Sequence, residues 1–179
     1  PVVDLAVGRG EWLDVLGREG IAASGVDTSK RAVTAAAKRG FDVARPHATS
    51  HPAGLRESSV GAITAFGPVE RLGSPALLEL VDRALVALRP GGLLTLSAAN
   101  PTALDVGAAD VWLDPARRRP VHPDLLELLV LTRGFGEAEV RWLRPVDEGL
   151  ALLPEDLAGL APARAAALAD RLNRVIAGP

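Results

Sequence analysis

Several residue types that carry chemistry are missing or scarce in this chain of 179 residues. Cysteine is absent, which excludes disulfides, thiolate zinc sites and cysteine nucleophiles and fits our expectation of a reducing, cytoplasmic location. Tyrosine is also absent, and only three tryptophans and three phenylalanines are present, so we expect no aromatic platform for nucleic-acid bases. The formal net charge of −2 likewise predicts no field that would attract a polyanion.

Long apolar runs are missing too. No run reaches the ~18 residues expected of a membrane span, and the first residues lack the charged-then-apolar pattern of a signal peptide. Methionine is absent, from which we expect the chain to be a fragment or an excised domain. The hydrophobic fraction of 48% is ordinary for a globular protein, and the length predicts one domain with one core.

Short apolar runs alternate along the chain with segments of helical periodicity. Each apolar run is nearly continuous, which is typical of parallel strands covered by helices on both faces. We therefore predict an α/β fold with a doubly wound, Rossmann-like, mostly parallel sheet that binds ligands at the carboxyl ends of its strands. The predicted strands are residues 2–6, 21–26, 41–44, 60–66, 93–98 and 138–143, and the predicted helices are 11–19, 30–39, 74–88 and 123–133.

No internal repeat or low-complexity linker divides the chain. We predict a ligand-binding core over residues 1–150 and a C-terminal helical extension of the same domain over 151–179, where alanine and leucine recur at helical spacing. The loop 99–121 is longer than an ordinary connection, which makes it a candidate for a functional lid.

A glycine turn follows the first predicted strand. Gly8 and Gly10 let the backbone approach a ligand closely, and the helix that follows presents free N–H groups there. A dinucleotide fingerprint needs a third glycine where this chain has Leu13, so a nicotinamide dehydrogenase is disfavoured. A plain tight turn is the alternative. Asp4 lies within the apolar strand and needs donors, either backbone N–H groups of the turn or a ligand ammonium.

Asp27 ends the second predicted strand. A carboxylate at this position can accept hydrogen bonds from the two vicinal hydroxyls of a ribose. It can also serve as a cap of the following helix, beside Thr28 and Ser29.

The motifs taken together resemble those of class I S-adenosylmethionine-dependent methyltransferases. The matching segments are residues 4–10, Asp27, 61–72 and 88–92. Residues 100–101 and 112–120 are similar, more narrowly, to a bacterial methyltransferase group that includes O-antigen chain-terminating enzymes. The resemblance spans nearly the whole chain. In that group the last, antiparallel strand follows the position of Gly178 and Pro179, so we expect the sheet to lack it.

The resemblance implies S-adenosylmethionine as cofactor and assigns several residues to its site. Gly8 and Gly10 would line the methionine and ribose portions, and Asp27 would bind the ribose hydroxyls. His47 falls where the family places an acidic residue facing adenine, and Gly67 follows the fourth strand at the pocket wall. With Asp4, the implied cofactor-binding residues are Asp4, Gly8, Gly10, Asp27, His47 and Gly67.

Several positions depart from the family pattern. Ala6 replaces its first glycine, Gly67 and Arg71 replace two histidines, and Arg117 replaces the histidine of the long loop. In some relatives such histidines hold a divalent metal with acidic residues, so the resemblance implies no metal here.

Two side chains are candidates for a general base, which assists an oxygen nucleophile. Glu70 follows the fourth strand and His122 borders the long loop. The alternatives are structural: Glu70 as an ion-pair partner of Arg71 or a helix-start carboxylate, and His122 as a helix cap before Pro123.

Arg117, Arg118 and Arg119 can clamp a phosphate or carboxylate of an acceptor, or form a solvated charge run. We thus predict a methyltransferase, O-directed on a small polar or glycan-like acceptor. The alternative is a catalytically degenerate, methyltransferase-like binding or structural module. The sequence predicts neither a nucleic-acid partner nor an oligomeric state.

Overall fold

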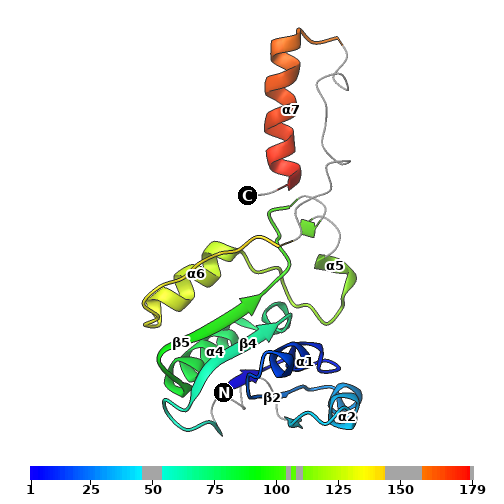
Figure 1. Cartoon of the computed structure of the whole chain (residues 1–179). Coiled ribbons are helices and arrows are strands. Elements are labelled where there is room, and N and C mark those ends of the chain that lie inside the picture. Colours follow the sequence, from blue (N-terminus) through cyan, green and yellow to red (C-terminus); the bar gives the residue numbers. More distant parts are fainter. Residues whose placement is uncertain (46–53, 104–105, 108–110, 144–158, 178–179) are drawn as a thin grey trace.

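A parallel five-stranded sheet forms the centre of the protein (Figure 1). The computed structural model describes residues 1–45, 54–103, 106–107, 111–143 and 159–177. Every strand pair is parallel, in the order β3-β2-β1-β4-β5, which confirms the predicted fold class. The strands are β1 (Val2–Asp4), β2 (Ala23–Val26), β3 (Val43–Ala44), β4 (Val60–Phe66) and β5 (Leu88–Ser97).

Helices connect the strands and cover the sheet. The chain steps from β1 to β2 and β3 in one direction across the sheet and from β4 to β5 in the other. Because β-α-β crossovers are right-handed, α1 and α2 therefore lie on one face of the sheet and α4 on the other. Helix α6 joins the α4 side, where Arg133 pairs with Asp82 of α4 at 3.3 Å. The helices are α1 (Glu11–Arg18), α2 (Lys30–Lys38), η1 (Val69–Arg71), α4 (Ser74–Ala87), α5 (Val111–Leu113), α6 (Pro123–Thr132) and α7 (Pro162–Ala177).

Two apolar clusters hold the layers together. The larger cluster joins β1, β4 and α4 through fully buried side chains such as Ile63, Leu80 and Val81. The smaller cluster fixes α1 against α2 and contains Leu13, which is 2% exposed. Leu13, the residue that replaces a third fingerprint glycine, is therefore a core side chain of the α1 packing.

Element boundaries differ from the sequence prediction at several points. Strand β1 ends at Asp4 instead of residue 6, and Gly73 rather than Ser74 occupies the cap position of α4. Residues 89–92, expected as a break after α4, lie inside β5, which begins directly at Leu88. The pairing shifts there, with two steps along β4 (Val60 to Ala62) matching five along β5 (Leu88 to Leu93). Gly91, at φ +75°, accommodates this bulge.

The predicted strand 138–143 is wrong, since these residues form no strand. The apolar residues of this segment suggested one. However, a strand needs a hydrogen-bonded neighbour, and no described segment pairs with this one. Val140 and Trp142 are 38% and 46% exposed, and Glu139 pairs with Arg141 at 2.9 Å.

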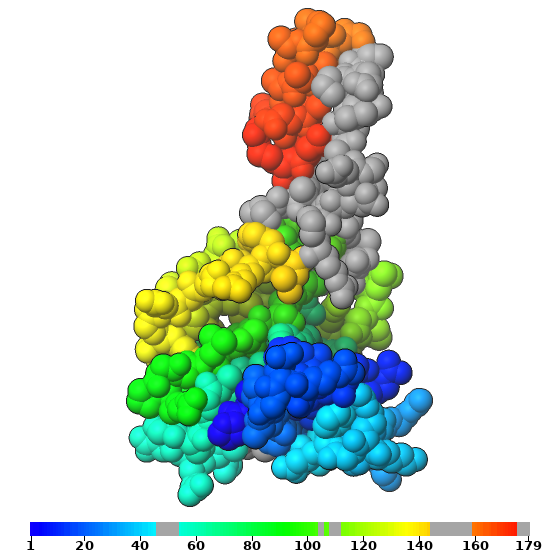
Figure 2. Space-filling view, viewed as in Figure 1, coloured from blue at the N-terminus to red at the C-terminus, as the bar shows by residue number. Residues whose placement is uncertain are grey.

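Helix α7 lies beyond the α/β unit, as the space-filling view shows (Figure 2). Its described end carries an exposed ion pair between Arg174 and Asp170 at 2.6 Å. The assignment of residues 151–179 to the same domain as the core stays a prediction. None of the described helices combines the length and the hydropathy needed to cross a membrane.

Candidate functional site

A pocket of about 340 Å³ opens at the carboxyl ends of β1, β2 and β4. Strand β1 is at the switch point, because the chain leaves it toward β2 on one side and returns to β4 on the other. Ligands of open parallel sheets bind at such crevices. The lining comprises Leu5, Ala6, Gly8, Asp27, Thr28, Phe66, Gly67, Pro68, Arg71 and Leu72.

The two glycines of the first turn have different surroundings. Gly8 has φ +57° and lines the pocket. Gly10 has φ +89° and lies outside the lining, and a Cβ atom there would come within 2.5 Å of the Phe41 ring. Gly10 thus permits the close packing of the turn against Phe41, while Gly8 leaves backbone open at the pocket.

Asp27 lines the pocket from the tip of β2. Its Oδ2 accepts the Gly8 N–H at 2.9 Å and its Oδ1 accepts the Ser29 N–H at 2.7 Å. A carboxylate has about four acceptor positions, so roughly two remain for a ligand. The helix α2 is capped by the Ser29 side chain, which accepts the Ala32 N–H at 3.3 Å. The helix-start and ligand-facing roles of Asp27 are therefore compatible.

Asp4 lies beneath the turn and is 1% exposed. Thr64 of β4 donates its hydroxyl to Asp4 Oδ1 at 3.0 Å. Burial raises the pKa of Asp4 and the nearby Asp27 charge adds to the rise, whereas hydrogen bonds from the Thr64 hydroxyl and from the backbone of Ala6 and Leu5 oppose it. Asp4 is absent from the pocket lining, and it links β1 to β4. A lone threonine within the apolar run of β4 was the signal that could have suggested this partner.

Glu70 is 2% exposed and binds other parts of the chain. Its Oε1 accepts the Ala99 N–H, and its Oε2 lies 2.9 Å from Arg117 Nε. Its backbone carbonyl also accepts the Arg118 N–H at 2.8 Å. Glu70 therefore joins η1 to the end of β5 and to the long loop, and it does not line the pocket. The expected partner was Arg71, but the observed partner is Arg117.

The arginine run lies beside the pocket lining without forming part of it. Arg117 pairs with Glu70, the Arg118 side chain is exposed, and Arg119 buries an Nε that has no partner among the described residues. The guanidinium that does line the pocket belongs to Arg71, which the sequence analysis treated as a departure from a family pattern and as a possible partner of Glu70, not as a pocket residue.

His122 caps α6, as its structural interpretation predicted. Its Nδ1 accepts the Asp124 N–H at 3.2 Å, and the residue lies outside the pocket lining. His47 falls outside the described residues. No group of three or more His, Asp or Glu side chains within the described ranges is arranged to hold a metal ion.

An aromatic pair adjoins the pocket on the β4 side. Phe66, in the lining, meets Trp12 of α1 edge to face at 5.4 Å between ring centroids. The Trp12 Nε1 is buried and has no partner in the described part of the chain. The sequence analysis did not assign Trp12 to the pocket.

Solved structures provide the comparison with known proteins. An S-adenosylmethionine-dependent methyltransferase from Archaeoglobus fulgidus is 24% identical over 99% of this chain and 81% of that one, with a TM-score of 0.88. One from Mesorhizobium loti is 17% identical over 97% and 85%, with a TM-score of 0.66. At these identities the similarity establishes the fold.

A third similar structure contains the cofactor. Haemonchus contortus phosphoethanolamine N-methyltransferase 2, solved with S-adenosyl-L-methionine, is 20% identical over 75% of this chain and 32% of that one, with a TM-score of 0.61. The chain matches no protein-family model and, at a significant level, no curated protein.

Proposed function

We propose that this protein is an S-adenosylmethionine-dependent methyltransferase that binds the cofactor in the pocket at the ends of β1, β2 and β4. The observation that carries the proposal is the Asp27 carboxylate, positioned by the Gly8 N–H at 2.9 Å and lining the pocket at the switch point. The fold shared with methyltransferases supports it at the level of architecture.

The residues present fit an adenosyl cofactor. The remaining acceptor positions of Asp27 suit two vicinal ribose hydroxyls. Gly8 leaves backbone accessible beside them, and Gly67, at φ +90°, has nothing within 4 Å of where a Cβ would lie. A side chain at either position would reduce the space, so both glycines favour a bulky ligand.

Each part of the pocket has a physical task in this proposal. S-adenosylmethionine, when bound, supplies a methyl group already activated on a sulfonium, so the protein mainly aligns the reactants. Asp27 fixes the ribose, and the Phe66–Trp12 pair provides an apolar wall that excludes water on the β4 side. Arg71 supplies positive charge on that same side.

The acceptor is proposed to be small and polar and to react through oxygen. Both Glu70 oxygens already bind Ala99 and Arg117, so we expect Glu70 to position the long loop rather than remove a proton. His122, engaged as a helix cap, is expected to act similarly as a structural residue. An acceptor oxygen that is ionised before it binds needs no such base. The proposal of a glycan-like acceptor rests on the resemblance of residues 100–101 and 112–120.

The second candidate is a methyltransferase-like module that binds without catalysis. The observation that favours it is that, of the described residues that line the pocket, none is a histidine, lysine or glutamate placed to act as a base. This module would retain cofactor binding at Gly8 and Asp27 and would lack turnover.

Calorimetry with S-adenosylmethionine tests the proposal. Saturable one-to-one binding supports a cofactor site, and formation of S-adenosylhomocysteine in the presence of an acceptor panel separates the enzyme from the module. Absence of binding by calorimetry and of any thermal shift would contradict both.

A further inference from the structure

Arg71 is the cationic side chain among the described residues that line the pocket. It belongs to η1, directly after β4, whereas Asp27 follows β2. Strands β2 and β4 flank β1 on opposite sides, and neighbouring strands lie about 4.8 Å apart, so these two strand ends are roughly 10 Å apart. The pocket is therefore polarised, with a carboxylate on the β2 side and a guanidinium on the β4 side.

The Arg71 guanidinium has donors available for a ligand. Its Nη2 contacts Asp114 Oδ2 at 3.0 Å, and the side chain is 58% exposed. No other partner of this guanidinium occurs in the parts of the chain that the structure describes. A guanidinium carries five N–H donors in a planar fork, and one contact leaves an edge that can bind a carboxylate or phosphate through two parallel hydrogen bonds.

Asp114, from the long loop, occupies part of that fork. Its Oδ1 independently accepts the Ala116 N–H at 2.9 Å, so the loop turn does not depend on Arg71 for its hydrogen bond. The Ala116 hydrogen bond and the Arg71 and Arg117 charges lower the pKa of Asp114 below its ordinary value, and the side chain is ionised at neutral pH. Asp114 is thus an internal anion that a ligand anion would replace or accompany at Arg71.

We propose that Arg71 is a specificity-determining residue that binds an anionic group, a carboxylate or a phosphate, of the methyl acceptor, in competition with Asp114. The assignment of the anion to a methyl acceptor rests on the proposed function, whereas the anion site at Arg71 does not depend on it. It moves the anion-binding role from Arg117, Arg118 and Arg119 to the arginine that lines the pocket.

Titration with inorganic phosphate, at constant ionic strength maintained with chloride, tests the anion site. The Arg71 Nε–Hε signal in nitrogen-edited NMR, assigned by its loss in Arg71→Gln, should shift saturably. Arg71→Gln should weaken phosphate binding by about tenfold or more, since hydrogen bonds to charged groups contribute at least this much. Arg71→Lys, which keeps a point charge without the fork, should retain an intermediate affinity.

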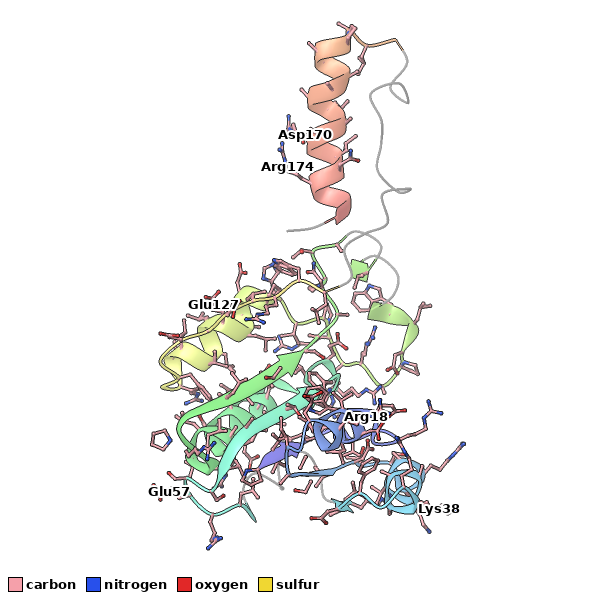
Figure 3. The ribbon with its side chains drawn as sticks, viewed as in Figure 1. Arg18, Lys38, Glu57, Glu127, Asp170 and Arg174 are labelled. Carbon is pink, nitrogen blue, oxygen red and sulfur yellow. The ribbon has the colours of Figure 1, made fainter. Side chains whose placement is uncertain are left out.

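Two further variants separate a binding role from a structural role. Asp114→Asn removes the competing charge and should tighten phosphate binding by about threefold. If the Arg71–Asp114 pair were only a loop tether, this variant would weaken binding or leave it unchanged, which would overturn the proposal. Arg18→Gln is the matched control, because Arg18 on α1 is also an exposed arginine paired with one aspartate, at 2.5 Å (Figure 3). An equal phosphate response at Arg18 would indicate non-specific binding and would also overturn it.

The titration is made on the cofactor-free chain and repeated with S-adenosylhomocysteine. If S-adenosylhomocysteine does not bind, the proposed function fails, and the cofactor-free titration still judges the anion site. If it binds and Arg71 responds to phosphate in neither form, only this inference fails. If it binds and abolishes the phosphate response, cofactor and acceptor cannot share the pocket, which contradicts an acceptor role for Arg71.

Discussion

The protonation of Asp4, which Thr64 binds beneath the first turn, makes the stability of the sheet depend on pH. Burial raises the pKa of Asp4 above its ordinary value of 3.8. The folded state therefore holds this proton more tightly than the unfolded state. The contribution of Asp4 to the free energy of unfolding falls as the pH rises from the unfolded pKa through the raised folded pKa. Thr64 limits this loss, because its hydrogen bond lowers the pKa of Asp4.

Thr64→Val should therefore destabilise the protein more at neutral pH than at acid pH. We expect a loss of about 1–3 kcal/mol at pH 7, the cost of leaving a buried acceptor without its partner, and a smaller loss where Asp4 is protonated in both states. Urea unfolding of both proteins across this pH range measures the difference. In the background of Asp4→Asn the pH dependence of the Thr64→Val effect should disappear, and its persistence there would contradict the assignment.

We expect Glu70 to stabilise the long loop rather than to serve as a general base. Glu70→Gln removes the charge that faces Arg117 and should lower the free energy of unfolding by roughly 1–3 kcal/mol, less than for a fully buried pair because Arg117 is 26% exposed. Amide exchange near Ala99 and Arg118 should become faster while cofactor affinity is retained.

A double-mutant cycle with Arg117→Gln checks the Glu70 prediction. The two losses should be strongly non-additive, because the residues form one contact. Additive losses, or loss of methyl transfer with unchanged exchange rates, would instead favour Glu70 as a base.

At the scale of elements, the turn between β1 and α1 makes distinct use of its two glycines. Gly10→Ala brings a Cβ within 2.5 Å of the Phe41 ring at φ +89°, so we expect the free energy of unfolding to fall by about 2 kcal/mol or more. Gly8→Ala meets only Glu11 Oε2 at 3.5 Å and should cost about 1 kcal/mol.

The ligand affinities of these two variants should rank differently from their stabilities. Gly8 lines the pocket, so Gly8→Ala should weaken S-adenosylmethionine binding more than Gly10→Ala does, when both are measured well below their unfolding midpoints. The reverse order of affinities would show that Gly10, not Gly8, faces the ligand.

The strands and the residues at their ends could be predicted because a short stretch of sequence carries the pattern for each. Continuous apolar runs predicted the five parallel strands, and Gly8 and Asp27 could be assigned to one sheet edge because the carboxyl ends of parallel strands meet there. The partner of Glu70 could not be predicted, because Arg117 is distant in sequence and only tertiary packing selects it. Thr64, the partner of Asp4, was indicated only by its polarity within the apolar run of β4. Strand 138–143 was predicted wrongly because apolar residues alone do not provide a neighbouring strand.

At the scale of the whole molecule, the account depends on one polarised pocket beside β1. The near-neutral net charge of −2 provides no long-range field, so ligand selection rests on Asp27 and Arg71 at the pocket itself. The same α/β architecture serves many chemistries, which makes the cofactor, rather than the fold, the point to be tested.

The affinity of Asp27→Ala for S-adenosylmethionine, measured by calorimetry beside the wild type and Asp42→Ala, tests this most directly. Asp42 is the matched control, an exposed aspartate near β3 outside the pocket lining. Loss of two hydrogen bonds to a charged group should weaken binding by about 100-fold in Asp27→Ala and leave Asp42→Ala at the wild-type affinity. Equal affinities in all three proteins, or no binding by the wild type, would contradict the account.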